Sequence, residues 1–338
     1  WKEKGIIRDS TSEYGSPVVL VRNDTSETTP KRLCIDYRAL NKKIREENYP
    51  MKHMDDVIDA IMSSNPEFFN VMDIKTAFLT VKIRVGDEYV TAFVTQDGQY
   101  EFLRMPFGLN IAPRVMQRNM DKGYGKIPKT TTYIDDLCQG ASSAKESLDL
   151  LERALEATEQ CGLKISLKKC QLVQRNISFL GNIVNKDGKT PDPKRTAAID
   201  KFVNFNDVKA VKRIFAFGAH YRKYLKDYAK FMKPVNDLMR KNVPFDFNEK
   251  CKKIIEQVKE KLKNPPILAH FKRDRETEVH VDASLSGFGG VLIQRDEYKN
   301  ERVIEYASRR LADSELNLHS NDLECGVVHS LIIGQLPI

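Results

Sequence analysis

The sequence has few cysteines, a single tryptophan and no long apolar run. Its six cysteines are scattered and form no Cys-x-x-Cys pair, which argues against a zinc site or a disulfide framework. No stretch approaches the roughly 20 apolar residues that a membrane-spanning helix needs. Only 17 glycines and 14 prolines occur while 41% of residues are apolar, which excludes a collagen-like or disordered chain. We expect an intracellular, packed protein with reduced thiols.

The two ends of the chain lack the marks of a complete protein. The sequence starts at Trp1 rather than methionine, and residues 1–4 do not resemble a signal peptide. We therefore expect a piece of something longer. A length of 338 residues predicts two or three domains, at roughly 100–200 residues for each.

Positive charge is concentrated in one segment. The net charge is +8, but residues 201–275 alone carry 20 basic and 8 acidic residues, so the rest of the chain is net acidic. Such a segment is typical of a surface that binds a polyanion. A solvated, lysine-rich face explains the charge equally well, and both interpretations stay open.

Hydrophobic periodicity predicts a mixed α+β body, a basic helical segment and a second α/β piece. Ser143 and Glu146 form a capping box, Gly162 ends the helix that follows, and Leu148, Leu151, Leu155 and Thr158 are expected on its buried face. The expected strands are 16–21, 32–37, 68–72, 79–83, 89–94 and 100–103, the expected helices are 55–61, 111–122 and 144–161, and residues 130–139 are expected to form a hairpin. Basic helices extend to residue 263, and strands resume at residue 278 after Pro265 and Pro266.

Chemistry is concentrated at Tyr133-Ile134-Asp135-Asp136, in the expected hairpin turn. Two adjacent carboxylates repel each other, and a divalent cation removes that cost. Asp73 follows an apolar strand and is the obvious third carboxylate. Three carboxylates could hold two Mg²⁺ ions about 3.5–4 Å apart for phosphoryl transfer. If the tetrapeptide stood alone, an ordinary Asx turn would be the better interpretation.

Ordered sequence blocks on both sides reverse that judgement. The blocks are Gly5–Arg8, Ser16–Val21, Cys34–Lys42, Asp73–Phe78, Met105–Pro113 with Gln117, Tyr133–Asp136, Phe179–Val184 and Phe217–Tyr224. Together they resemble the reverse transcriptases of Ty3/gypsy-type LTR retrotransposons and their retroviral relatives, nearly from end to end.

The resemblance implies a right-hand polymerase followed by an incomplete RNase H-like α/β domain. It assigns residues 1–190 to the fingers and palm, 191–265 to the thumb and connection, and 266–338 to the first part of the RNase H-like domain. Phe179–Val184 would be the primer grip, although a buried strand explains that block nearly as well.

The same resemblance implies roles for individual residues. Asp73, Asp135 and Asp136 would bind two Mg²⁺ ions, with Mn²⁺ as an alternative, and the Ile74 carbonyl would add a ligand. The remaining residues would contact the nucleotide: Arg32 its triphosphate, Phe78 its sugar, and Phe107 and Gly108 the floor beneath it. Arg32 as an exposed strand residue and Phe78 as a core residue remain the alternatives.

The second acidic pair is Asp282, on a strand, with Glu324. The resemblance makes both metal-binding residues that hydrolyse the RNA of an RNA–DNA hybrid. Gly326 follows in a segment one residue short of the family pattern, and the sequence stops before the other acids of such a domain. We expect this hydrolase half to be incomplete and inactive.

The implied function is an RNA-directed and DNA-directed DNA polymerase that extends a primer with dNTPs. Its partners would be an RNA or DNA template with primer and an RNA–DNA hybrid, without a membrane, in the cytoplasm or within virus-like particles. The sequence leaves the oligomeric state open. One alternative is a decayed, non-catalytic nucleic-acid-binding product. Another is an RNA-templated RNA polymerase, against which Phe78 argues.

Overall fold

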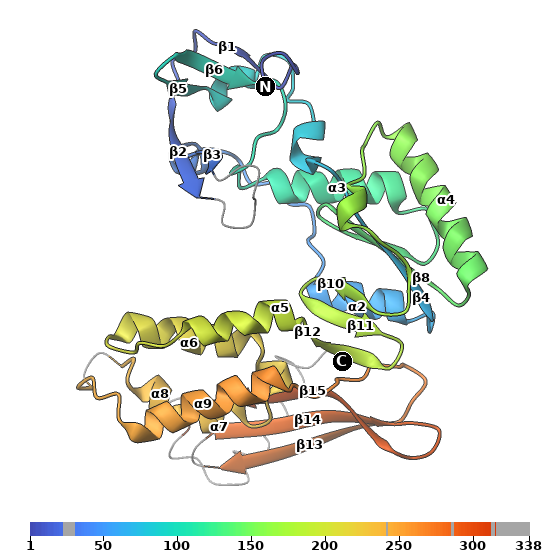
Figure 1. The fold of residues 1–338 in the computed structure, drawn as a ribbon, viewed down its shortest axis with the longest axis vertical. Helices are drawn as coiled ribbons and strands as arrows, with labels where there is room; N and C mark the ends of the chain where they lie inside the picture. Colours follow the sequence, from blue (N-terminus) through green and yellow to red (C-terminus); the bar gives the residue numbers. More distant parts are fainter. Residues whose placement is uncertain (23–30, 241–242, 285–286, 312–314, 316–338) are drawn as a thin grey trace. The chain divides into compact units, whose positions relative to one another are not determined.

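The computed structural model describes residues 1–22, 31–240, 243–284, 287–311 and 315 (Figure 1). The chain forms two compact units, Trp1–Arg175 and Asn176–Ile338. Both units mix helices with strands, which confirms the expected α+β class. The functional division near residues 190 and 265 stays a prediction. Within the described part of the chain, no helix is long and apolar enough to cross a bilayer.

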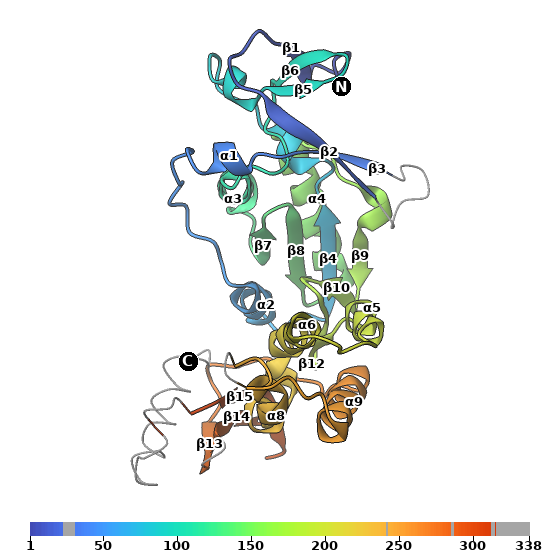
Figure 2. The same ribbon diagram turned by 90° about the vertical axis from the view of Figure 1, so that its left-hand side faces the viewer.

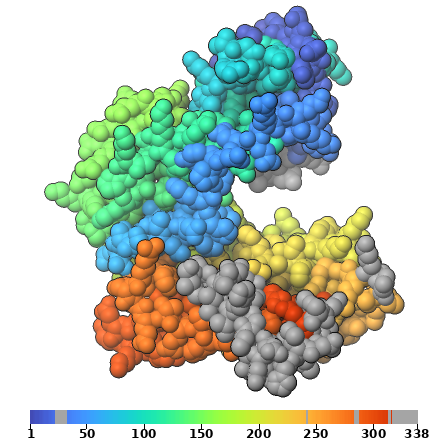
Figure 3. All heavy atoms as spheres, turned by 180° about the vertical axis from the view of Figure 1, so that it is seen from behind, coloured from blue at the N-terminus to red at the C-terminus, as the bar shows by residue number. Residues whose placement is uncertain are grey.

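The first sheet of unit 1 has five strands in the order β1-β6-β5-β2-β3. These are β1 (Ile7–Asp9), β2 (Ser16–Arg22), β3 (Lys31–Ile35), β5 (Phe93–Thr95) and β6 (Gly98–Phe102). Segments almost a hundred residues apart therefore pair, since Ile7 faces Phe102. Figure 3 shows the blue N-terminal atoms against the teal atoms of residues near 100. The short helices α1 (Arg38–Asn41) and α2 (Met54–Met62) follow this part of the sheet in the sequence.

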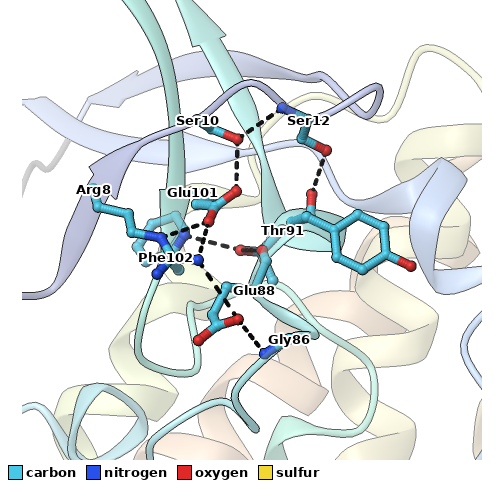
Figure 4. Close-up of polar contacts among 9 residues, drawn as sticks. Arg8, Ser10, Ser12, Gly86, Glu88, Thr91, Glu101 and Phe102 are labelled. Atoms are coloured by element: carbon cyan, nitrogen blue, oxygen red, sulfur yellow. Dashed lines mark hydrogen bonds and ion pairs between the residues drawn. The ribbon is translucent and has the colours of Figure 1, made fainter.

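A polar cluster joins β1 to the rest of this sheet (Figure 4). The Arg8 guanidinium donates to Glu101 at 2.7 Å and lies 3.7 Å from Glu88, and the Ser10 hydroxyl donates to Glu101 at 2.6 Å. Glu88 also accepts from the Gly86 N–H at 2.7 Å. Both glutamates are only 5% exposed, so these donors compensate two buried carboxylates.

The second sheet of unit 1 carries the acidic motif. Its antiparallel strands lie in the order β7-β8-β4-β9 and stand side by side in Figure 2. They are β4 (Phe68–Asp73), β7 (Thr130–Tyr133), β8 (Asp136–Ala141) and β9 (Gln171–Gln174). Helices α3 (Ala112–Tyr124) and α4 (Ala144–Gln160) contact this sheet. Buried Met72, Met116, Met120 and Leu137 fill the core between them.

Helix α4 confirms its predicted ends but only part of its predicted face. The Ser143 hydroxyl caps the Glu146 N–H at 3.2 Å, whereas Glu146 reaches back to the Ser142 N–H at 2.8 Å rather than to Ser143. Gly162 has the expected left-handed φ of 65°.

The expected face of α4 was correct for Thr158, which is 6% exposed, and for Leu151, which packs partly buried on the core, but wrong for Leu148 and Leu155, which are 55% and 46% exposed. The buried residues of α4 are Ser147, Leu150, Ala154 and Thr158. Buried amides of the sheet then bond helix carbonyls, with Asn70 donating to Ser147 at 2.8 Å and Gln139 to Leu150 at 2.9 Å.

Two expected strands begin as short 3-10 helices instead, η1 (Ala77–Thr80) and η2 (Glu88–Thr91). Thr76 takes a left-handed φ of 52° immediately before η1, and the Thr80 hydroxyl donates to the Ala77 carbonyl at 2.5 Å. This local bonding turns the chain and leaves only an isolated bridge between Lys82 and Arg104 where a strand was expected. A third short helix, η3 (Leu167–Lys169), precedes β9.

Unit 2 contains two three-stranded antiparallel sheets and a helical region between them. One sheet is β10 (Ile177–Phe179), β11 (Asn182–Asn185) and β12 (Gly188–Pro191); the other is β13 (Thr277–Ser284), β14 (Gly287–Arg295) and β15 (Glu301–Arg309). The helices are α5 (Pro193–Thr196), η4 (Ala197–Lys201), α6 (Val208–His220), η5 (Arg222–Tyr224), α7 (Tyr228–Phe231), α8 (Lys233–Asp237) and α9 (Glu249–Lys263). Their shared core includes Val211, Ile214, Val235 and Leu262.

Candidate active site

Three predicted carboxylates lie at one end of the second sheet of unit 1. Asp73 is the last residue of β4 and faces Asp136, the first residue of β8, across the strand pair. Asp135 sits in the two-residue turn that joins β7 to β8. The pairing of β4 with β8 therefore brings together residues about 60 positions apart, as the sequence predicts.

The turn that carries Asp135 is strained and held from two sides. Ile134 has a φ of 56°, a left-handed conformation that a β-branched residue adopts at a cost of about 1–3 kcal/mol. Its N–H donates to the Gln117 side-chain oxygen at 2.7 Å. From the other side, the Ile74 N–H donates to the Asp135 carbonyl at 3.1 Å. These two bonds fix the backbone position of Asp135.

Electrostatics disfavour negative charge at this turn. Burial raises the pKa of the Asp135 carboxyl, a backbone hydrogen bond opposes that rise, and the Asp73 carboxylate raises the pKa further. Lys169, on η3, lowers it again and places its ammonium 3.1 Å from an Asp73 carboxylate oxygen. Asp73 and Asp135 thus lie close enough for their charges to interact, in a site that favours a cation.

The donor chemistry of the site fits magnesium. Carboxylate oxygens are the hard ligands that Mg²⁺ prefers, and a cation relieves the repulsion between Asp73 and Asp135. Across the described residues, however, no group of three His, Cys, Asp or Glu side chains is gathered to hold a metal ion. The structure brings Asp73 and Asp135 together, with the ammonium of Lys169 as their counter-charge, and does not complete a three-carboxylate cage.

Ile74 is 1% exposed and lies directly after Asp73. Hydrogen bonds fix the backbone on both sides of Ile74. The Ser166 N–H donates to the Asp73 carbonyl at 2.9 Å, and the Lys75 N–H donates to the Lys164 carbonyl at 2.7 Å. The backbone of Ile74 is therefore held beside the acidic turn. A ligand role for its carbonyl stays a prediction.

The predicted aromatic residues meet one another. Phe78, on η1, packs edge-on against Phe107 with ring centroids 5.4 Å apart, and Phe107 is 53% exposed. Gly108 has a φ of 97°, and its carbonyl accepts from the Asn41 amide at 2.8 Å. A side chain at Gly108 would be strained by this φ, so the turn that presents Phe107 requires glycine.

Arg32 lies in β3, opposite Val21. Its side chain is outside the described part of the structure, so its contact with a triphosphate stays a prediction.

Of the second acidic pair, only Asp282 lies in the described part of the structure. Asp282 is on β13, opposite Gly289, and its side chain is 73% exposed and paired with the Lys230 ammonium of α7. Glu324 lies outside the described residues.

Sequence reasoning missed the support beneath the acidic turn. Gln117 is fully buried, and its amide nitrogen donates to the Asp121 carboxylate at 3.0 Å. The same carboxylate accepts from the Thr132 hydroxyl at 2.6 Å. The available signal was an acid four residues after Gln117 on the same helix face, directly before the hairpin.

Family models match two parts of the chain. Residues 23–184 match the model described as reverse transcriptase (RNA-dependent DNA polymerase), and residues 247–332 match the RNase H-like domain found in reverse transcriptase. These matches agree with the resemblance drawn from the sequence blocks.

Curated relatives match nearly the whole chain. A retrovirus-related Pol polyprotein from transposon 412 of Drosophila melanogaster is 31% identical over 337 residues, which is 98% of this chain and 27% of that protein. The transposon Tf2-3 polyprotein of Schizosaccharomyces pombe is 28% identical over 95% of this chain and 24% of its own length. The chain thus spans about a quarter of the length of these relatives.

Solved structures show the same fold. A foamy viral protease-reverse transcriptase dRH in complex with dsDNA matches with a TM-score of 0.87 at 20% identity, over 98% of this chain and 57% of that one. The foamy viral protease-reverse transcriptase in complex with an RNA/DNA hybrid matches with a TM-score of 0.84, over 98% of this chain and 44% of that one, also at 20% identity. The expected polymerase fold followed by an RNase H-like domain is confirmed.

Proposed function

This chain belongs to the reverse transcriptase and RNase H-like region of retrotransposon Pol polyproteins, and on that premise we propose that it is an RNA-directed DNA polymerase. It extends a primer with dNTPs on an RNA or DNA template, inside the cell. One observation carries the proposal: Asp73 and Asp135 meet at the end of one sheet, within range of each other's charge, on a turn fixed by the Ile74 and Gln117 hydrogen bonds.

Asp73, Asp135 and Asp136, with the Ile74 carbonyl, would hold the metal ions of this reaction. Two Mg²⁺ ions, or Mn²⁺ in their place, supply activation of the primer 3′-hydroxyl and charge neutralisation at the triphosphate. The chain's own residues position the site. The strained Ile134 turn presents Asp135, and Lys169 keeps a positive charge at Asp73.

The nucleotide contacts would come from unit 1. Phe78 and Phe107 offer a rigid aromatic surface beside the sugar, and Arg32 offers a guanidinium for bidentate contact with the triphosphate. A bulky ring below the ribose position would reject a 2′-hydroxyl by steric clash.

Template and primer would be bound in part by α6 of unit 2. Its buried face is apolar, with Val211 and Ile214 fully buried, and its exposed face carries Lys209, Lys212, Arg213 and His220. A basic helix face of this kind binds a phosphate backbone without reading its sequence. Asp282 and Glu324 would act on the RNA of a hybrid only within a completed hydrolase site.

A second candidate is a non-catalytic nucleic-acid-binding protein. One observation favours it: the described carboxylates do not form a three-residue metal cluster. Tight, salt-sensitive binding to an RNA–DNA hybrid without nucleotide incorporation in Mg²⁺ or Mn²⁺ would select this candidate.

Primer extension on poly(rA)/oligo(dT) with dTTP and Mg²⁺ separates the two. We expect incorporation by the wild-type chain and none by Asp135→Asn, whose fold should survive because burial already disfavours that charge. Asp149→Asn makes the same chemical change on the exposed face of α4 and should retain full activity. Equal incorporation by wild type and Asp135→Asn would refute the polymerase proposal.

A further inference from the structure

Asp121 is the centre of a hydrogen-bond network beneath the acidic turn. It lies on α3, and its side chain is 23% exposed. One carboxylate oxygen accepts from the Thr132 hydroxyl at 2.6 Å, from the Gln117 amide at 3.0 Å and from the Lys52 ammonium at 3.1 Å. The other accepts from the Tyr49 hydroxyl at 2.9 Å. Four donors converge on a single carboxylate.

The ionised state of Asp121 is favoured by these contacts. Burial pushes the pKa of Asp121 up, but the hydrogen bonds from Thr132, Tyr49 and Lys52 together lower it below the ordinary value. An ionised carboxylate only accepts hydrogen bonds. The Gln117 side chain must therefore turn its NH₂ group toward Asp121.

The orientation of the Gln117 amide decides whether the Ile134 N–H in the acidic turn has an acceptor. With its NH₂ group on Asp121 and on the Thr132 carbonyl at 3.2 Å, its oxygen faces the Ile134 N–H at 2.7 Å. A flipped amide would place two donors against each other and leave the strained Ile134 backbone without this bond. The sequence of contacts runs from Asp121 through Gln117 to the residue before Asp135.

We propose that Asp121 is a positioning residue of the polymerase site, which fixes the Asp135 turn by setting the orientation of the Gln117 amide. This inference rests on the proposed polymerase function. The competing interpretation is purely structural: Asp121 would only anchor Tyr49 and Lys52, in the segment before α2, to helix α3.

Paired variants distinguish these interpretations. Asp121→Asn offers Gln117 a donor as well as an acceptor, so the Gln117 amide can flip. We expect kcat to fall about 10- to 100-fold while KM for dTTP changes less than about threefold, because a small displacement of a reacting group costs rate. Tyr49→Phe removes a bond to the oxygen that faces away from Gln117, and its kcat should stay within about twofold of wild type.

A double variant that exchanges the acid and the amide between positions 117 and 121 supplies the rescue test. Gln117→Glu alone places two carboxylates in contact and should lose at least as much activity as Asp121→Asn. In the double variant Gln117→Glu/Asp121→Asn, the carboxylate introduced at position 117 accepts from the Ile134 N–H and from the amide introduced at position 121. The link from position 121 to Ile134 is restored, while the bond from position 117 to the Thr132 carbonyl is lost. We expect the double variant to recover to within about fivefold of wild type.

Amide hydrogen exchange at Ile134, read by NMR, reports the same contact without catalysis. Exchange should be fast in both single variants and slow in wild type, Tyr49→Phe and the double variant. The inference is overturned if Asp121→Asn behaves like Tyr49→Phe in both measurements, or if the double variant is no better than the single variants. If the wild-type chain incorporates no nucleotide, the polymerase proposal fails, and the ranking of Ile134 exchange still decides the role of Asp121.

Discussion

The two units each present an aspartate on a strand, but they support it differently. In unit 1, Asp73 is 19% exposed, faces Asp136 across the strand pair, and lies beside a turn fixed by backbone and buried side-chain bonds. In unit 2, Asp282 is 73% exposed, faces a glycine, and is paired with the ammonium of Lys230.

The comparison shows that residue type and strand position do not define an acidic site. Support from neighbouring elements does, because catalysis requires a group held in place before the substrate arrives. Unit 1 has this support in the described residues. In unit 2 the predicted partner acid, Glu324, lies outside them.

The strongest test of this contrast replaces one aspartate by asparagine in each unit. If Asp73 is a metal ligand as proposed, Asp73→Asn should reduce primer extension on the order of 1000-fold, because one of the charges that would hold the metal is lost. Asp282→Asn makes the same change in unit 2 and should stay within about twofold of wild type. Similar losses in both variants would show that the units do not divide the chemistry in this way.

Acid should act with opposite sign at one group in each unit, His270 in unit 2 and Asp135 in unit 1. In unit 2, His270 is buried, its Nε2 N–H donates to the Asn185 carbonyl at 2.8 Å, and burial lowers its pKa to about 4. Its stabilising contribution is complete above the unfolded pKa near 6.5 and is lost as the pH falls toward 4, at most about 3 kcal/mol. In unit 1, Asp135 has a raised pKa, so acid relieves repulsion at the turn.

The free energy of unfolding, measured by hydrogen exchange between pH 7 and pH 4.5, resolves the two units. Stability of unit 2 should fall toward acid in wild type and change less in His270→Gln, which keeps a donor for Asn185 but does not titrate. An unchanged slope in this variant would assign the acid sensitivity to other groups.

Sugar selection should belong to unit 1 alone. Phe78→Val removes the ring that packs on Phe107 and should raise rNTP use relative to dNTP use about tenfold, because the steric barrier to a 2′-hydroxyl is smaller. Phe205→Val removes an aromatic of unit 2 that stacks on Phe247 at 4.8 Å, and it should leave sugar preference unchanged. If Phe78→Val gains no rNTP use, Phe78 is a core residue and does not select the sugar.

The smallest effect is expected at the lysine of unit 2. Lys230→Met breaks the pair with the exposed Asp282 and should change the free energy of unfolding by less than about 1 kcal/mol, since such pairs are screened by water. Thermal unfolding of the variant measures this. A much larger loss would mean that Asp282 is supported as firmly as Asp73.

Local patterns in the sequence predicted the parts of the fold that depend on neighbours in the chain. Ser143 caps α4 and Gly162 ends it, because each acts within one helical turn. The buried face of α4 was predicted only in part, since it also depends on the distant amides of Asn70 and Gln139, which bond its carbonyls.

The candidate site divides in the same way. Asp73 and Asp135 were predicted as neighbours because a motif in the correct order implies a strand pairing. Asp121 was missed because its importance depends on donors from three separate segments, Tyr49–Lys52, α3 and β7. Such convergence exists only after folding.

The polar cluster at Arg8 determines how far the protein can be shortened. Removal of the first ten residues deletes Arg8 and Ser10, the two side-chain donors to Glu101. It also deletes strand β1, so β6 would lose the counter-charge of Glu101 together with its edge neighbour. A truncated version that starts at the family block Ser16–Val21 would therefore have a destabilised first sheet, although Asp73, Asp135 and Asp136 would all still be present.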